Sequence, residues 1–121
     1  MTGRQLYEKS LSLISETTDT AGFPDAQVIS LINFVLFECF KINNSIRASK
    51  DLEKFAAPQQ ITAMTDTLTY DDDLTLIVIP YGLVSKLLES DDEIDKSNHF
   101  QEIYANYLND SEKVEIMVVT L

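Results

Sequence analysis

The sequence predicts a mainly α-helical fold, a bundle of about four helices with a small two-stranded antiparallel β element. Apolar residues recur at three- and four-residue steps over most of the chain, which is the period of an amphipathic helix. Only three glycines and three prolines interrupt the 121 residues. The last eight residues, in contrast, are rich in the apolar and β-branched types that favour strands. With 45% hydrophobic residues, the chain is expected to form one domain, residues 1–121, around a single core.

A first helix is expected over residues 4–17, where apolar side chains fall on one side. That side consists of Leu6, Tyr7, Leu11, Leu13 and Ile14. Residues 18–23, which include Gly22, form the break. Pro24 and Asp25 then favour a helix start, because proline fits an early helical position and aspartate fits the first turn.

The second helix is expected to run from about residue 25 to residue 43, with apolar residues around most of its circumference. These residues are Val28, Ile29, Leu31, Ile32, Phe34, Val35, Leu36, Phe37 and Phe40. A helix that is apolar nearly all round is buried on several sides, so it is either a central core helix or a subunit interface. Either way, Phe34 is expected to be buried, and an aspartate there would destabilise the fold strongly.

Two segments favour a strand, one weakly in the middle of the chain and one strongly at its end. Residues 42–55 are expected to continue as a short helix or an ordered loop that ends before Pro58. Residues 60–68 alternate weakly between apolar and polar types, as a strand would. Residues 114–121 form the strongest strand signal, and they are expected to pair with residues 60–68 or with a neighbouring subunit, since an unpaired apolar strand aggregates.

Residues 70–108 contain the two clearest apolar stripes. Residues 74–88 suit one helix face, with three aspartates at its start and a kink at Pro80. A strand over residues 74–79 followed by a helix from Tyr81 remains the alternative, because the first part is β-branched.

A further helix is expected where apolar residues fall at i, i+3, i+4, i+7 and i+8. They are Phe100, Ile103, Tyr104, Tyr107 and Leu108. Because the acidic linker over residues 89–95 is short, this helix and the preceding one should pack as an antiparallel hairpin. The tyrosines are expected to be core residues with their hydroxyls at the rim.

Four stretches of the chain resemble the head-tail connector (adaptor) group of small structural proteins from tailed phages and prophages. The stretches are RQLYEKSLSLISE, VISLINFVLFE, ITAMTDTLTYDDDLTLIVIPYGLVSKLLESDDE and HFQEIYANYL. In that family a short β segment precedes an acidic turn, a "PYGLA"-like helix, an acidic break and an "F…Y" helix. Val84 stands where a small alanine is usual, which should loosen the helix packing there.

The resemblance implies a non-enzymatic virion structural protein, a connector subunit that assembles into a ring between portal and tail. Its implied partners are copies of itself, the portal and tail components. Its implied location is the bacterial host cytoplasm during assembly and the virion afterwards.

Charge is unevenly distributed along the chain. Residues 1–60 hold six Lys or Arg and seven Asp or Glu, a net charge of −1; residues 61–121 hold three and thirteen, a net charge of −10. So acidic a half repels phosphate, which argues against sequence-specific nucleic-acid binding. The simplest interpretation is a solvated surface, and the family resemblance implies a ring wall past which DNA moves. The acidic half also suits the alternative function, an acidic regulator or DNA mimic that occupies a nucleic-acid-binding protein.

Neither a membrane segment nor a secretory signal is expected. The most apolar window, residues 28–40, is too short to span a bilayer and contains Asn33 and Glu38. Arg4 and Lys9 near the N-terminus are not followed by an apolar signal region. A single cysteine, Cys39, argues for a reducing compartment without a disulfide.

The remaining candidate chemistry is weak. Residues 91–102 match the ligand spacing of a calcium loop superficially, but Lys96 stands where that loop requires glycine. Cys39 and His99, the sole cysteine and the sole histidine, could form a Cys–His dyad, but no oxyanion-forming turn lies nearby in the sequence. No catalytic, cofactor-binding or metal-binding residue is therefore assigned, no cofactor is expected, and the protein is not expected to be an enzyme.

Overall fold

Helices make up most of the fold in the computed structural model, which describes the backbone of residues 1–120 and the side chains of residues 1–110. The mainly helical expectation is confirmed. In chain order the helices are α1 (Gly3–Ser12), α2 (Thr18–Ala21), α3 (Asp25–Ser49), a π-helical turn η1 (Leu74–Val78), α4 (Ile79–Ser90) and α5 (Ile94–Thr120).

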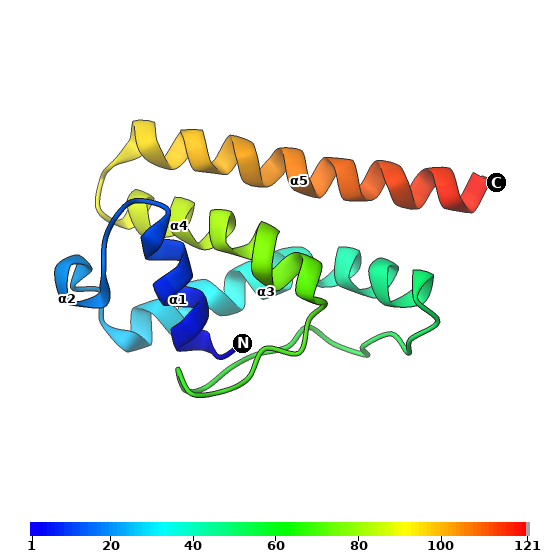
Figure 1. Ribbon diagram of the computed structural model, residues 1–121, viewed down its shortest axis with the longest axis horizontal. Coiled ribbons are helices and arrows are strands. Elements are labelled where there is room, and N and C mark those ends of the chain that lie inside the picture. The colour runs from blue at the N-terminus through cyan, green and yellow to red at the C-terminus, as the bar shows by residue number, and fades with distance from the viewer. Residues whose placement is uncertain (121) are drawn as a thin grey trace.

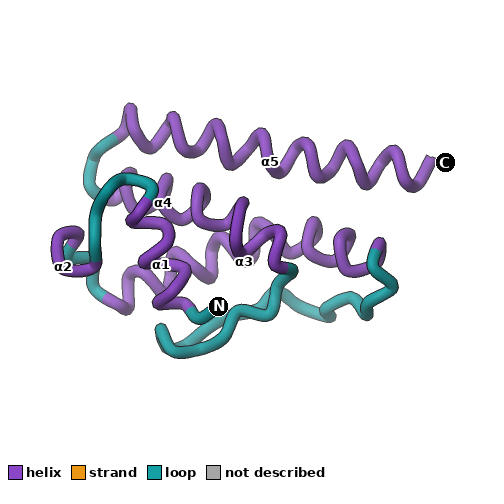
Figure 2. The backbone as a smooth tube through the Cα atoms, in the orientation of Figure 1, coloured by secondary structure: helices purple, strands orange, loops and turns teal. Residues whose placement is uncertain are grey.

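The arrangement places α4 between α5 on one side and α1 and α3 on the other (Figure 1). The long connection between α3 and η1 runs along the side of α3 that lies away from α5 (Figure 2). The core fills the space between these helices. Among its fully buried side chains are Leu6, Leu11, Ile32, Leu36, Ile79, Leu83, Leu87 and Tyr104.

The first helix is shorter than expected, ending at Ser12 rather than at residue 17. Its start is a capping box, in which the Thr2 hydroxyl accepts from the Gln5 amide and the Gln5 side chain accepts from the Thr2 amide. Its end comes early because Ser15 adopts a left-handed conformation, φ 57°, and the Glu16 amide turns back to the Leu11 carbonyl. The expected break that follows contains the one-turn helix α2.

The second expected helix exists but extends to Ser49, beyond the predicted end near residue 43. Two asparagines in this extension hydrogen-bond to the neighbouring loops. Asn43 accepts from the Asp71 amide at 2.8 Å. Asn44 accepts from the Phe55 amide at 2.8 Å and donates to the Phe55 carbonyl at 3.0 Å. Their side chains therefore satisfy loop backbone while their own backbone stays helical.

The prediction that Phe34 of α3 lies in the core was wrong. Phe34 and Phe37 are 55% and 69% exposed, so an aspartate at Phe34 would not enter the core. The inner side of the helix is formed by other residues, among them Ile32, Leu36 and Cys39. Apolar type alone could not separate the inner from the outer side here, because few polar residues mark the outer one.

The predicted two-stranded β element is also wrong for the described residues. Residues 60–68 form turns, and their only strand-like contact is an isolated antiparallel bridge between Thr2 and Thr67. Backbone groups in this segment are taken by side chains instead. Asn33 donates to the Ile61 carbonyl and accepts from the Ile61 amide, and Asp66 accepts from two nearby amides. Few backbone amides and carbonyls of residues 60–68 are therefore left to hydrogen-bond with a neighbouring strand.

The partner strand expected at the C-terminus is helical as well. Residues 114–120 continue α5, and Leu121 lies outside the described residues. A helix satisfies backbone groups within one segment, so it does not need the partner that a strand would require. Without a ladder at residues 60–68, the strand preference of the β-branched tail is overridden by this local alternative.

The helical interpretation of residues 74–88 is confirmed, with a π-helical turn just before Pro80. In this turn the Ile79 amide donates to the Leu74 carbonyl, five residues back. Proline lacks an amide hydrogen, and in a regular helix its ring would clash with the carbonyl four residues earlier, at Leu76. The wider turn accommodates the proline without ending the helix, which reconciles the β-branched run with a helical backbone.

The helical hairpin is confirmed. α4 and α5 are joined by a tight acidic turn in which Asp92 has a φ of 58° and the Glu93 amide donates to the Leu88 carbonyl. The five acidic side chains in residues 89–95 are exposed, and α4 packs against α5. This hairpin positions the residues of the candidate site.

Candidate functional site

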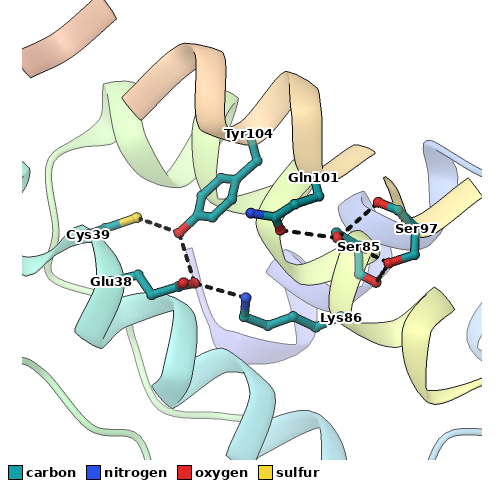
Figure 3. Close-up of polar contacts among 7 residues, drawn as sticks. All are labelled: Glu38, Cys39, Ser85, Lys86, Ser97, Gln101 and Tyr104. Carbon is teal, nitrogen blue, oxygen red and sulfur yellow. Dashed lines mark hydrogen bonds and ion pairs between the residues drawn. The ribbon is translucent and has the colours of Figure 1, made fainter. Parts of the chain in front are cut away.

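Tyr104 lies at the junction of three helices (Figure 3). It comes from α5, is fully buried, and packs its ring directly on Gly82 of α4. A β-carbon at position 82 would lie 2.8 Å from two ring carbons, so only glycine leaves room for this approach. The hydroxyl then reaches α3, where it donates to Glu38 at 3.2 Å and contacts the Cys39 sulfur at 3.3 Å.

Glu38 also forms an ion pair with Lys86 of α4. The Lys86 ammonium lies 2.9 Å from the same carboxylate oxygen that accepts from Tyr104, and 5.7 Å from the centre of the Tyr104 ring. Burial is the main cause that raises the pKa of Tyr104 far above its usual range, and it raises the pKa of Cys39 to about 11. A protonated thiol and phenol are poor nucleophiles, so this network fastens helices together rather than activating a group.

A second polar cluster joins α4 to the start of α5 (Figure 3). The Ser97 hydroxyl donates to the Ser85 carbonyl at 2.8 Å, and the Ser85 hydroxyl lies 3.1 Å from the Ser97 carbonyl and 3.2 Å from Gln101 Oε1. Ser85 and Ser97 are buried. Both serines use their hydroxyls for the opposite helix, so they fix how α5 leaves the turn.

Cys39 and His99, the candidate dyad of the sequence, do not come together in the structure. Cys39 is buried and contacts the Tyr104 hydroxyl, whereas His99 is exposed on α5 with its ring edge-on to Phe100. The acidic residues of the calcium-like pattern lie exposed in the α4–α5 turn and on α5. Within the part of the chain whose side chains are described, no group of three His, Cys, Asp or Glu residues is arranged to hold a metal.

The aspartates before η1 lie at a helix start, as the sequence predicts. Asp71 accepts from the Asp73 amide at 3.0 Å and from the Lys50 ammonium at 2.8 Å. Burial alone would raise the pKa of Asp71, but the two hydrogen bonds and the positive charges of Lys50 and Arg47 together outweigh it and lower the pKa. Asp72 and Asp73 are exposed beside it. Asp71 therefore caps the helix, and Asp72 and Asp73 leave a negative surface at its start.

An exposed aromatic pair lies next to the three-helix junction. Phe34 and Phe37 are one helical turn apart on α3, and we call them the phenylalanine surface. The Lys86 ammonium lies 4.9 Å from the centre of the Phe34 ring, and Lys41 is exposed one turn beyond Phe37. Large aromatic side chains with cations beside them are typical of interaction surfaces.

A second exposed apolar pair lies on η1. Leu76 and Ile77 are 44% and 48% exposed, and we call them the π-turn surface. Asp72 and Asp73 lie one turn before them. The α-helix that continues from the turn carries Tyr81, whose ring contacts Tyr107 of α5 at 5.7 Å. The turn thus presents aliphatic side chains next to acidic ones.

Sequence reasoning missed both the Gly82–Tyr104 contact and Lys86. The family resemblance directed attention to Val84 as the position of close packing, yet Val84 is fully buried and the close approach occurs at Gly82. The signal was a glycine inside an otherwise continuous helical pattern, opposite a helix whose stripe contains a tyrosine.

The chain was compared with models of protein families, with curated proteins and with solved structures, and none of them matches it. Over its described residues, no helix is both long enough and apolar enough to cross a membrane.

Proposed function

We propose that this chain is a non-enzymatic structural subunit of a tailed phage or prophage, a head-tail connector that acts by docking to copies of itself and to the portal and tail proteins. The phenylalanine surface carries the proposal. Two phenylalanines exposed by 55% and 69% on one helix face are costly for an isolated subunit and useful for an assembling one.

Three further features support a subunit that docks to other proteins and lines a ring, rather than an enzyme. The junction of Tyr104, Glu38 and Lys86 is fastened by a hydrogen bond and an ion pair, and its Lys86 ammonium lies against the Phe34 ring, so the phenylalanine surface adjoins a well-connected part of the fold. Burial raises the pKa of Cys39 to about 11, which moves it away from the reactive thiolate. The strongly acidic second half of the chain suits a ring wall past which DNA moves during assembly in the bacterial host and afterwards in the virion.

A second candidate is an acidic regulator or DNA mimic, favoured by the exposed carboxylates of the α4–α5 turn. Five of them fall within residues 89–95. A mimic would use these carboxylates as a track of phosphate-like charges against a basic protein. The two candidates differ in the force that drives association, and salt separates them.

The test is capture of the portal protein encoded in the same phage or prophage, at low salt and at about 1 M salt. Contacts driven by apolar area should persist at high salt, whereas binding of a mimic should weaken steeply. Exchanging Phe34 and Phe37 for serine should abolish capture, because subunits that no longer dock to one another through this surface would each hold the portal only singly and weakly. The matched control is Leu52→Ser, which removes another exposed apolar side chain, 47% exposed, from the loop after α3 and should leave capture intact.

Recovery of a basic, DNA-binding partner alone, lost at high salt, would reject the connector proposal in favour of the mimic. Recovery of the portal by the serine variant as efficiently as by the unaltered chain would reject the phenylalanine surface as the docking site.

A further inference from the structure

The chain exposes two apolar surfaces that are separate from each other. Ile77 precedes Lys86, which lies against Phe34, by nine residues of helix, or about 13 Å of rise. One turn beyond Ile77, Tyr81 contacts the ring of Tyr107 on α5, whereas Lys86 contacts Glu38 on α3. The two surfaces therefore adjoin different neighbours, and one subunit can use both at once.

The charges beside the two surfaces are opposite. The phenylalanine surface is flanked by Lys41, Lys86 and Glu38, a net charge of +1. The π-turn surface follows three aspartates; Asp71 and Asp73 contact Lys50, and Arg47 also acts on Asp71, so this cluster has a net charge of −1. An aromatic pair with excess positive charge complements an aliphatic pair with excess negative charge.

We propose, on the basis of the function proposed above, that the phenylalanine surface of one copy docks on the π-turn surface of the next copy. Pairing either surface with itself across a two-fold axis would bring like charges together, whereas front-to-back pairing joins opposite charges. A front-to-back contact leaves one surface free at each end of a pair. Repetition of the contact then generates a ring if the rotation closes.

The contact is expected to be weak in isolation. A standard interface covers about 800 Å² on each partner, roughly a ninth of this chain's 7081 Å² of accessible surface. Two side chains on each surface supply a small centre for such an interface. Covalent trapping is therefore a better assay than equilibrium size, because it accumulates short-lived encounters.

The experiment pairs cysteine variants under oxidising conditions with a mild catalyst. Phe37→Cys protein is mixed with Ile77→Cys protein, and disulfide-linked dimers are followed on non-reducing gels. The expected result is rapid cross-linking in the mixture and little in either variant alone. A single chain that carries both substitutions should form a ladder of oligomers. Both positions are exposed, and far-UV circular dichroism verifies that each variant folds.

Two controls define the background. The unaltered chain reports on Cys39, whose thiol is buried and should not cross-link. A mixture of Ser12→Cys and Ser90→Cys reports random collisions between exposed positions outside both surfaces. If a substitution at Phe37 or Ile77 disturbs folding, Lys41→Cys with Asp72→Cys provides a second pair on the polar edges of the same surfaces.

Charge reversal provides a test that random collision does not pass. Lys41→Glu in the Phe37→Cys protein should slow cross-linking about two- to fivefold, the scale of a surface ion pair. When that Lys41→Glu protein is mixed with Ile77→Cys protein that also carries Asp72→Lys, the cross-linking rate should be restored, because the two surfaces again carry opposite charges. Phe34→Ser should slow cross-linking about tenfold, as for a central interface residue.

Two results would overturn the proposal. One is cross-linking of Phe37→Cys with itself as fast as in the mixture, which would indicate a symmetric contact. The other is cross-linking of the mixture at the rate of the Ser12→Cys and Ser90→Cys control. Portal capture without disulfide trapping would reject this contact between copies and leave the connector function standing. Trapping without portal capture would support the contact and reject the connector function.

Discussion

Replacing Gly82 with alanine tests the contact that brings α5 onto α4. The new β-carbon would lie 2.8 Å from Cε1 and Cζ of Tyr104 and 3.0 Å from Cδ1, closer than carbon atoms normally approach. The ring cannot move aside freely, because it is fully buried and its hydroxyl is hydrogen-bonded to Glu38 and in contact with Cys39.

Two opposing effects set the size of the change. Alanine is favoured over glycine within a helix by about 1 kcal/mol. Overpacking of a well-filled core costs about 1–3 kcal/mol. Because the ring is held at its far end, we expect overpacking to win and the free energy of unfolding to fall by about 1–2 kcal/mol. For a chain of this size, the melting temperature should fall by roughly 3–10 °C.

The assay is urea unfolding followed by far-UV circular dichroism, within a double-mutant cycle. Tyr104→Leu removes the ring and costs stability through a cavity, but it also removes the clash. In that background, alanine at position 82 should stabilise the protein by about 0.5–1 kcal/mol through helix propensity. If Gly82→Ala has the same effect with and without the Tyr104 ring, the clash does not exist and the reasoning is wrong.

Three further predictions concern burial, the ion pair and pH. Phe34→Asp should change the melting temperature by no more than a degree or two, whereas Leu36→Asp, on the buried side, should unfold the protein or cost several kcal/mol; thermal melts compare them. Lys86→Met should cost about 1–2 kcal/mol in urea unfolding, because Glu38 loses its cation in a half-buried site, and adding Glu38→Gln should recover part of that loss. Burial raises the pKa of Tyr70 from 10 to about 12, so its contribution to stability is complete below pH 10 and is lost as pH rises toward 12. Urea unfolding at stepped pH should show a steeper alkaline loss in the unaltered chain than in Tyr70→Phe; equal slopes would contradict this.

Periodicity predicted the helices well where polar residues mark the outer side. The α4–α5 hairpin follows from two stripes and a short acidic linker, and the structure contains it. On α3 the same reasoning failed for Phe34 and Phe37, because apolar residues surround the axis and only tertiary packing decides which side is inside.

The β element could not be predicted correctly from local preference. A strand needs a partner with free backbone groups, and in residues 60–68 those groups are already taken by Asn33 and Asp66. These hydrogen bonds link positions up to 28 residues apart, which no local pattern reveals. The candidate site shows the same limit, since Tyr104, Glu38 and Lys86 come from three helices and meet only after folding.

The π-helical turn also changes which way the residues before it face relative to the residues after it. An α-helix rotates by about 100° per residue, so the widened turn leaves the residues before it out of step with those after it by about one residue. Leu76 and Ile77 thereby face outward, although Leu83 and Leu87 on the continuing helix face the core. Loss of one residue from this turn would restore a single phase and rotate Asp71 away from α3. The apolar pair and the helix cap are thus linked by the number of residues in one turn.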